Sequence, residues 1–88
     1  MSTERAPAEI EAAVVAYLSD ELKVDDPDLD RDTKLVRTGL LDSVSLVQLA
    51  AWAERAFGIE IPDEDIDGEH LESIGMIVEY VLARLQTS

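Results

Sequence analysis

The sequence predicts an all-α fold, a small bundle of helices that forms a single domain over residues 1–88. Apolar residues recur three or four positions apart in three separate stretches, which is the spacing of amphipathic helices. Hydrophobic residues make up 47% of the chain, enough for a packed core and too many for a disordered tail. With 88 residues the core is modest, so we do not expect a two-domain enzyme with a deep cleft.

The first helix is expected over residues 7–22. Pro7 suits the first turn of a helix, and Glu9 lies near the amino-terminal end, where the helix dipole favours a negative charge. The apolar face of this helix comprises Ile10, Val14, Tyr17, Leu18 and Leu22.

Residues 23–41 are expected to form a long loop, because their many Asp residues and Pro27 favour turns over helix. A structureless loop of this length in a compact domain usually has a function. Calcium binding is the sharper alternative for these acids, but the glycine and the final glutamate of an EF-hand are missing at the required spacing. The residues expected to attach the loop to the core are Leu29, Leu35, Leu40 and Leu41.

The second helix is expected over residues 43–57. It starts at Asp42 or Ser43 and stops before Gly58, a common helix terminator. Trp52 lies off the centre of the core face, which suits packing at the core edge, with a partner contact as the alternative. The core face comprises Leu46, Leu49, Ala50, Ala53 and Phe57.

A second stripe runs along the same helix beside Ser43, and we call it the docking strip. It comprises the apolar residues Val44, Val47 and Ala51 and the polar residues Gln48 and Arg55. Such residues are either scattered surface apolars, which need no explanation, or a surface on which a partner docks. The periodicity leaves both interpretations open.

A short third helix is expected over residues 66–71, after an extended segment. The last helix is expected over residues 74–86, with Ser73 as its N-cap. Gly75 in its first turn either permits the close approach of a neighbour or is neutral. The apolar stripe of the last helix comprises Ile74, Ile77, Val78, Val81, Leu82 and Leu85.

The charge and the rare residues exclude several classes of function. A net charge of −13 repels nucleic acid and anionic membranes. The same charge either attracts partners with basic patches or serves only to keep a small protein soluble. The absence of Cys excludes disulfides, thiolate metal sites and a Cys nucleophile, and His70 is the only His. No apolar run could span a bilayer and no secretory leader is present, so we expect a cytoplasmic protein. With one His and no Cys we expect no metal site, and we expect the protein to be a monomer.

Ser43 has three possible roles at the start of its helix. Asp and Ser are favoured there simply as helix caps. As a catalytic nucleophile, Ser43 would need an adjacent base with an orienting group, and His70 is the one imidazole available. As a substrate, Ser43 would be modified by an outside enzyme, and a phosphodiester formed there would lie at the positive end of a helix.

Three segments occur together at one spacing: GLLDSV at 39–44, FGIEIPD at 57–63 and IVEYV at 77–81. In this combination they resemble the acyl and peptidyl carrier proteins, which bind phosphopantetheine, and the resemblance extends over about residues 8–85. An Asp-Ser pair alone is a weak signal, whereas the pair followed by an apolar helix and then Phe-Gly-Ile-x-Ile-Pro is a strong one.

The resemblance implies a four-helix bundle of the acyl-carrier type, with a long first loop and a short third helix. It implies that Ser43, preceded by Asp42, receives 4′-phosphopantetheine from coenzyme A through a magnesium-dependent phosphopantetheinyl transferase. It also implies that the chain is no enzyme itself and that its docking strip contacts partners at Val44 and Val47. The other partners would be an adenylating or acyl-loading enzyme and downstream modifying or condensing enzymes.

One departure from the family bears on the cargo. Fatty-acid carriers typically have acidic residues soon after the serine, where this chain has Ser45 and Gln48, with Arg55 further on. The chain therefore resembles more closely the free-standing carriers of secondary metabolism, which hold an aminoacyl or small acyl group as a thioester in nonribosomal peptide or polyketide biosynthesis, antibiotics included. The alternatives are a D-alanyl or fatty-acyl carrier and an unmodified acidic adaptor.

Overall fold

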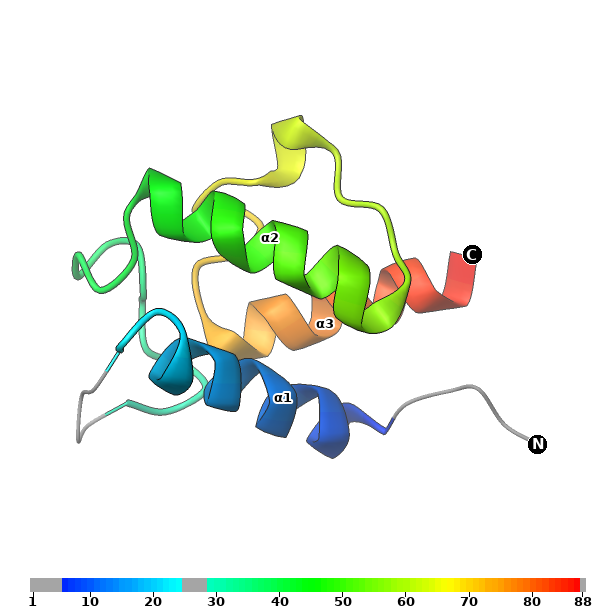
Figure 1. Ribbon diagram of the computed structural model, residues 1–88, viewed down its shortest axis with the longest axis horizontal. Coiled ribbons are helices and arrows are strands. Elements are labelled where there is room, and N and C mark those ends of the chain that lie inside the picture. Colours follow the sequence, from blue (N-terminus) through cyan, green and yellow to red (C-terminus); the bar gives the residue numbers. More distant parts are fainter. Residues whose placement is uncertain (1–5, 25–28, 88) are drawn as a thin grey trace.

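The protein is described by a computed structural model that covers residues 6–24 and 29–87. Its elements are α1 (Pro7–Asp20), α2 (Ser43–Phe57), a short 3-10 helix η1 (Asp63–Asp65) and α3 (Ile74–Thr87). In Figure 1, α1 runs in the opposite direction to α2 and α3, so the first loop and the starts of α2 and α3 gather at one end of the bundle. The all-α prediction is therefore confirmed for the described residues.

The core forms where the three long helices meet, and α3 packs against both α1 and α2. Most residues of the expected apolar faces are buried, and Leu29 and Leu40 pack against them from the first loop. Four residues of these faces are only partly buried: Tyr17, Leu22, Leu82 and Leu85. The largest fully buried side chains are Ile10, Val14, Leu18, Leu35, Leu41, Leu49, Leu71, Ile74, Ile77, Val78 and Val81. The first loop is thus part of the core, because two of these residues belong to it.

Helix α1 is two residues shorter than expected. It ends at Asp20 because the chain turns at Lys23, whose φ of 58° lies in the left-handed region. The turn brings Val24 N–H to Leu18 O at 2.9 Å, and Val24 is buried. At the other end, Glu9 Oε1 accepts the Ala6 N–H at 3.1 Å and satisfies a backbone donor that the helix leaves open.

Helix α2 ends at Gly58 as expected. The φ of Gly58 is 68°, a value that favours glycine, and its N–H donates to Glu54 O at 2.9 Å. The side chain of Glu54 then accepts the Ile61 N–H at 2.9 Å. The last turn of α2 therefore fixes the start of the extended segment and buries Ile59 and Ile61 against the core.

The short third helix expected over residues 66–71 is not formed. The only helical turn between α2 and α3 is η1, which lies earlier, at Asp63–Asp65. Only one turn forms there: Asp67 Oδ1 accepts the N–H groups of Glu69 at 2.9 Å and His70 at 3.0 Å, and Asp67 O accepts the Leu71 N–H at 3.0 Å. The turn does not continue because the next residue, Glu72, binds Leu35 of the first loop through its carbonyl, and Ser73 then caps α3.

Helix α3 begins as expected, since Ser73 Oγ accepts the Met76 N–H at 3.2 Å. Gly75 in its first turn is buried, and its N–H donates to Arg31 O at 2.9 Å. A Cβ atom on Gly75 would lie 3.3 Å from that oxygen and 3.2 Å from Arg31 Nε. Gly75 therefore permits the close approach of the first loop, the first of the two roles expected for it.

Candidate functional site

Ser43 is the first residue of α2 and is exposed. The cap of this helix is Asp42, whose Oδ1 accepts the Ser45 N–H at 2.8 Å. Within the described part of the chain, no hydrogen bond is made by the Ser43 hydroxyl. Because Asp42 provides the capping oxygen, a capping role does not account for a serine at position 43.

The carboxylate of Asp42 stays ionised beside this hydroxyl. The hydrogen bond from the Ser45 backbone N–H lowers the pKa of Asp42 below its ordinary value of 3.8. A negative charge at the start of a helix is further stabilised by the helix dipole. Asp42 thus fixes the first turn of α2, the turn that presents Ser43 to solvent.

The residues before Ser43 form a closed, hydrogen-bonded loop. Leu41 N–H donates to Leu35 O at 3.0 Å, and both side chains are buried. Inside the loop, Thr38 Oγ1 donates to Lys34 O at 2.6 Å, and Gly39 takes a φ of 83° that favours glycine. Ser43 therefore follows a segment that is anchored in the core at both of its ends.

The chemistry available at Ser43 is that of a substrate. His70, the only imidazole of the chain, contacts two carboxylates elsewhere, Asp67 at 2.8 Å and Asp65 at 3.6 Å. An unassisted serine hydroxyl is a weak nucleophile. The free N–H groups at the start of a helix stabilise an attached anion. The site therefore fits a covalently attached phosphoryl group better than it fits catalysis by Ser43.

The docking strip lies on an open face of α2. The side chains of Val44 and Val47 are 64% and 56% exposed, and both rank among the exposed large hydrophobic residues of the described chain. Gln48 and Arg55 are exposed as well, and Ala51 is half-buried. The structure thus leaves the strip open to solvent, where a partner can reach it.

Beside the strip, a hollow of about 320 Å³ lies between α1 and α2. Its lining includes Gln48, Ala51 and Arg55 from α2, and Tyr17 from α1. The Tyr17 hydroxyl donates to Gln48 O at 3.2 Å. The ring of Tyr17 stacks on Trp52, with centroids 4.6 Å apart, which places Trp52 at the core edge as expected.

The acids of the first loop provide no evidence for a metal site. Asp25, Asp26 and Asp28 lie outside the described residues. Among the described residues, no group of three His, Cys, Asp or Glu side chains could hold a metal ion. Asp30 Oδ1 instead accepts the Asp32 N–H at 2.8 Å, so this acid shapes a turn.

The comparisons with known proteins identify the family. A family model described as "Phosphopantetheine attachment site" matches residues 12–81. An acyl carrier protein of Amoebophilus asiaticus is 33% identical over 78 residues, which cover 89% of this chain and 95% of that protein. The chain belongs to the acyl carrier protein family. Members of this family carry acyl groups on a covalently attached 4′-phosphopantetheine, so that group is the cofactor of this carrier.

Two further comparisons agree with this assignment. An acyl carrier protein of Thermotoga maritima is 32% identical over 77 residues, covering 88% of this chain and 93% of that protein. A crystal structure of an acyl carrier protein from the same organism superposes with a TM-score of 0.74 at 21% identity, over 92% of each chain. The fold of the carrier is therefore the acyl-carrier fold. No helix in the described residues is long and apolar enough to cross a membrane.

One residue of the site was missed by sequence reasoning. Glu72 is buried, and its carboxylate holds the loop that precedes Ser43. The available signal was an acid between Leu71 and Ser73, in a segment that must meet the core. An acid in such a segment needs a partner, but the sequence does not show which backbone groups supply it.

Proposed function

We propose that Ser43 is the residue that carries 4′-phosphopantetheine, and that the thiol of this arm holds an aminoacyl or small acyl group as a thioester. The supporting observation is the exposed hydroxyl of Ser43 at the start of α2, with its capping task already taken by Asp42. The family match includes this position, because it extends over residues 12–81. The bound arm supplies the thiol that the chain lacks, since the sequence contains no Cys.

The absence of Cys makes a sharp test possible. Incubation with coenzyme A, magnesium and a broad-specificity phosphopantetheinyl transferase, followed by a maleimide dye, should label the wild-type carrier and leave Ser43→Ala unlabelled. Every label must sit on the arm, because the chain has no thiol of its own. Labelling of Ser43→Ala would show that another residue is modified.

For the cargo, we propose an aminoacyl or small acyl group in nonribosomal peptide or polyketide biosynthesis, in the cytoplasm. The docking strip supports this assignment, because its only charged residue is the cationic Arg55 and acids are absent at Ser45 and Gln48. The relatives are named acyl carrier proteins, which keeps a fatty-acyl carrier as the second candidate.

A variant that restores acidic residues after Ser43 distinguishes a carrier of aminoacyl or small acyl groups from a fatty-acyl carrier. The malonyl transferase of fatty-acid synthesis should load the phosphopantetheinylated carrier slowly, compared with a fatty-acid carrier in parallel. The double substitution Ser45→Glu and Gln48→Glu should increase that rate several-fold, because it restores the acids typical of fatty-acid carriers. Fast loading of the wild-type carrier, with no gain in the double variant, would favour the fatty-acyl candidate.

The proposed partners are a phosphopantetheinyl transferase, an adenylating or acyl-loading enzyme, and the enzymes that modify or condense the cargo. We propose that they contact the docking strip, since it adjoins Ser43 and keeps Val44 and Val47 exposed. An unmodified adaptor would use the same strip, but Ser43→Ala would then leave its function intact.

A further inference from the structure

A buried carboxylate lies directly before α3. Glu72 is only 8% exposed, and its Oε2 accepts two backbone hydrogen bonds, from Val36 N–H at 2.7 Å and from Arg37 N–H at 3.0 Å. The Arg37 guanidinium adds a looser contact, with 3.9 Å between Nε and Glu72 Oε1. The backbone carbonyl of Glu72 also accepts the Leu35 N–H at 2.6 Å.

These contacts bind one short stretch of the first loop, residues 35–37, to the start of α3. Burying a carboxylate is costly unless hydrogen bonds and charge compensate it, so the site is stable only while the loop stays in place. The Arg37 side chain is 77% exposed, which leaves the two backbone N–H groups as the main partners of the carboxylate.

The same stretch leads along the chain to Ser43. Leu35, held by the Glu72 carbonyl, accepts the Leu41 N–H at 3.0 Å. Leu41 is followed by Asp42, the cap of α2, and then by Ser43. These backbone hydrogen bonds reach Leu41, two residues before the serine. The carboxylate acts on the same loop through Val36, whose N–H it accepts and whose carbonyl accepts the Gly39 N–H at 3.1 Å.

We propose that Glu72 is a positioning residue for the modification of Ser43: it holds the 35–41 loop in the one conformation in which a transferase can dock on the start of α2. The inference rests on the proposed role of Ser43 as the attachment site. Glu72 contacts residues 35–37 and acts on Ser43 through this loop. Without its carboxylate the loop samples other conformations, and the docking-competent fraction falls.

The hydrogen-bond geometry supplies a matched set of variants. Both backbone N–H groups donate to the same oxygen, Oε2. The single side-chain carbonyl oxygen of Glu72→Gln can therefore replace this acceptor. Glu72→Ala removes the acceptor, and Glu72→Asp withdraws it by the length of one methylene. Glu79→Ala is the control for charge, because it removes one exposed carboxylate from α3.

The test is the initial rate of phosphopantetheinylation against the concentration of unmodified carrier, at a temperature well below the unfolding midpoint of every variant. For Glu72→Ala we expect a KM for the carrier about tenfold higher with kcat little changed, because the apparent affinity falls with the competent fraction. Glu72→Gln should stay within about twofold of wild type, Glu72→Asp should lie between, and Glu79→Ala should match wild type.

A purely structural role predicts another result. Glu72→Ala would then unfold at a lower temperature but keep the wild-type KM and kcat while folded, and that outcome would overturn the proposal. If Glu72→Ala does not fold, Glu72→Asp decides by the same comparison.

Amide NMR of the unmodified carrier gives a readout without the transferase: the Leu41 and Ser43 signals should move in Glu72→Ala and not in Glu79→Ala. NMR signals that do not move would contradict the positioning role. A wild-type carrier that the transferase fails to modify would contradict the proposed role of Ser43.

Discussion

Asp42 and Ser43 divide two tasks that either residue could perform at a helix start. Asp42 caps α2 through its hydrogen bond with the Ser45 N–H, and Ser43 occupies the first helical position with its hydroxyl exposed. The division matters because a serine that is needed as a cap cannot be modified without cost to the helix. Here the proposed attachment residue and the capping residue are neighbours.

This division is testable by stability. Asp42→Ala should lower the free energy of unfolding in urea by about 1 kcal/mol, the usual cost of a lost N-cap. Ser43→Ala should change it by less than about 0.5 kcal/mol, because an exposed residue without a hydrogen bond is removed. An equal or larger loss for Ser43→Ala would show that the serine is the cap.

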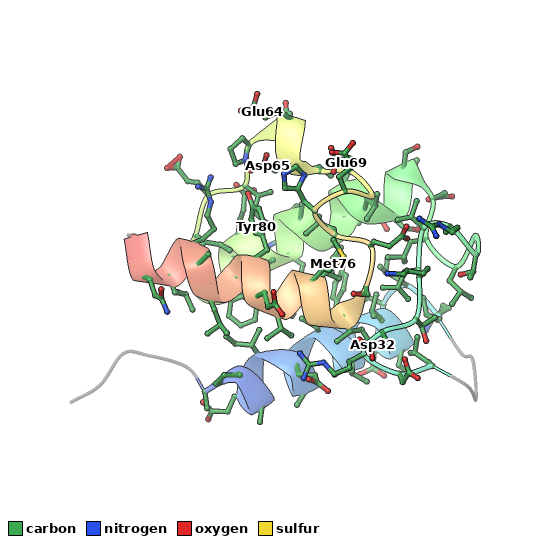
Figure 2. All side chains as sticks on the ribbon, turned by 180° about the vertical axis from the view of Figure 1, so that it is seen from behind. Asp32, Glu64, Asp65, Glu69, Met76 and Tyr80 are labelled. Carbon is green, nitrogen blue, oxygen red and sulfur yellow. The ribbon has the colours of Figure 1, made fainter. Side chains whose placement is uncertain are left out.

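His70 lies between the carboxylates of Asp65 and Asp67, and Asp65 of η1 is also hydrogen-bonded to Tyr80 of α3. Its Nδ1 is 2.8 Å from Asp67 Oδ1 and its Nε2 is 3.6 Å from Asp65 Oδ1, while Tyr80 donates a hydrogen bond of 2.6 Å to Asp65 Oδ2. Figure 2 shows Tyr80 of α3 reaching toward Asp65. The hydrogen bond with Asp67, aided by the charges of Asp65 and Glu69, raises the pKa of His70 above 6.5.

The stability of the carrier should therefore depend on pH through His70. Because the folded pKa of His70 lies above its unfolded value, protonated His70 stabilises the fold fully below pH 6.5, and this contribution is lost as the pH rises through the raised pKa. Asp67, whose pKa is lowered by the same hydrogen bond, stays ionised throughout this window, and burial holds the pKa of Tyr80 at about 12.

The measurement is the unfolding temperature of wild type and His70→Gln between about pH 6 and pH 9. Wild type should be the more stable protein at the acidic end, and the difference should shrink toward the alkaline end. A difference that is constant or grows with pH would show that the protonated ring does not stabilise the cluster.

At the scale of the element, α2 has a buried face and an exposed face. Its core face is buried, whereas Val44 and Val47 stay exposed on a helix that begins at Ser43. An exposed apolar pair of this kind costs the free carrier solubility unless a partner covers it. We therefore expect the docking strip to give α2 a role in recognition as well as in packing.

Val47→Asp tests this role, with Val15→Asp as the matched control on α1, where Val15 is 38% exposed. The new charge on the docking strip should slow transfer of cargo to or from partner enzymes by tenfold or more, on the order of a lost apolar contact. Attachment of the arm should slow less. Equal losses in the two steps, or the same losses in Val15→Asp, would contradict docking at this strip.

The helices could be predicted from the sequence because periodicity and caps decide them locally. The apolar spacing, Gly58 and Ser73 predicted α2 and α3 almost to the residue. The prediction of a short helix over residues 66–71 was wrong, because the turn at Asp67 stops where Glu72 binds Leu35 of the first loop, and composition does not reveal that contact. Glu72 was missed for a similar reason, since its partners lie 36 and 35 positions away.

At the scale of the whole molecule, the net charge of −13 acts against the compact state, because like charges are held close together. The Cα radius of gyration is 12.2 Å, so at low ionic strength most of the acids lie within one screening length of each other. We therefore expect the acidity to destabilise the free carrier.

Raising NaCl from about 10 mM to about 1 M shortens the screening length from about 30 Å to about 3 Å and should raise the unfolding temperature by several degrees. An uncharged solute at matched osmolality serves as the control. An unfolding temperature that stays constant or falls with NaCl would show that self-repulsion does not limit the stability of this carrier.

The most direct test of the central claim is the intact mass of the protein after incubation with coenzyme A, magnesium and a broad-specificity phosphopantetheinyl transferase. Our account predicts a gain of one phosphopantetheine on the wild type and none on Ser43→Ala. No gain on folded wild type, with a known carrier modified in parallel, would contradict the account and leave an unmodified acidic adaptor as the function.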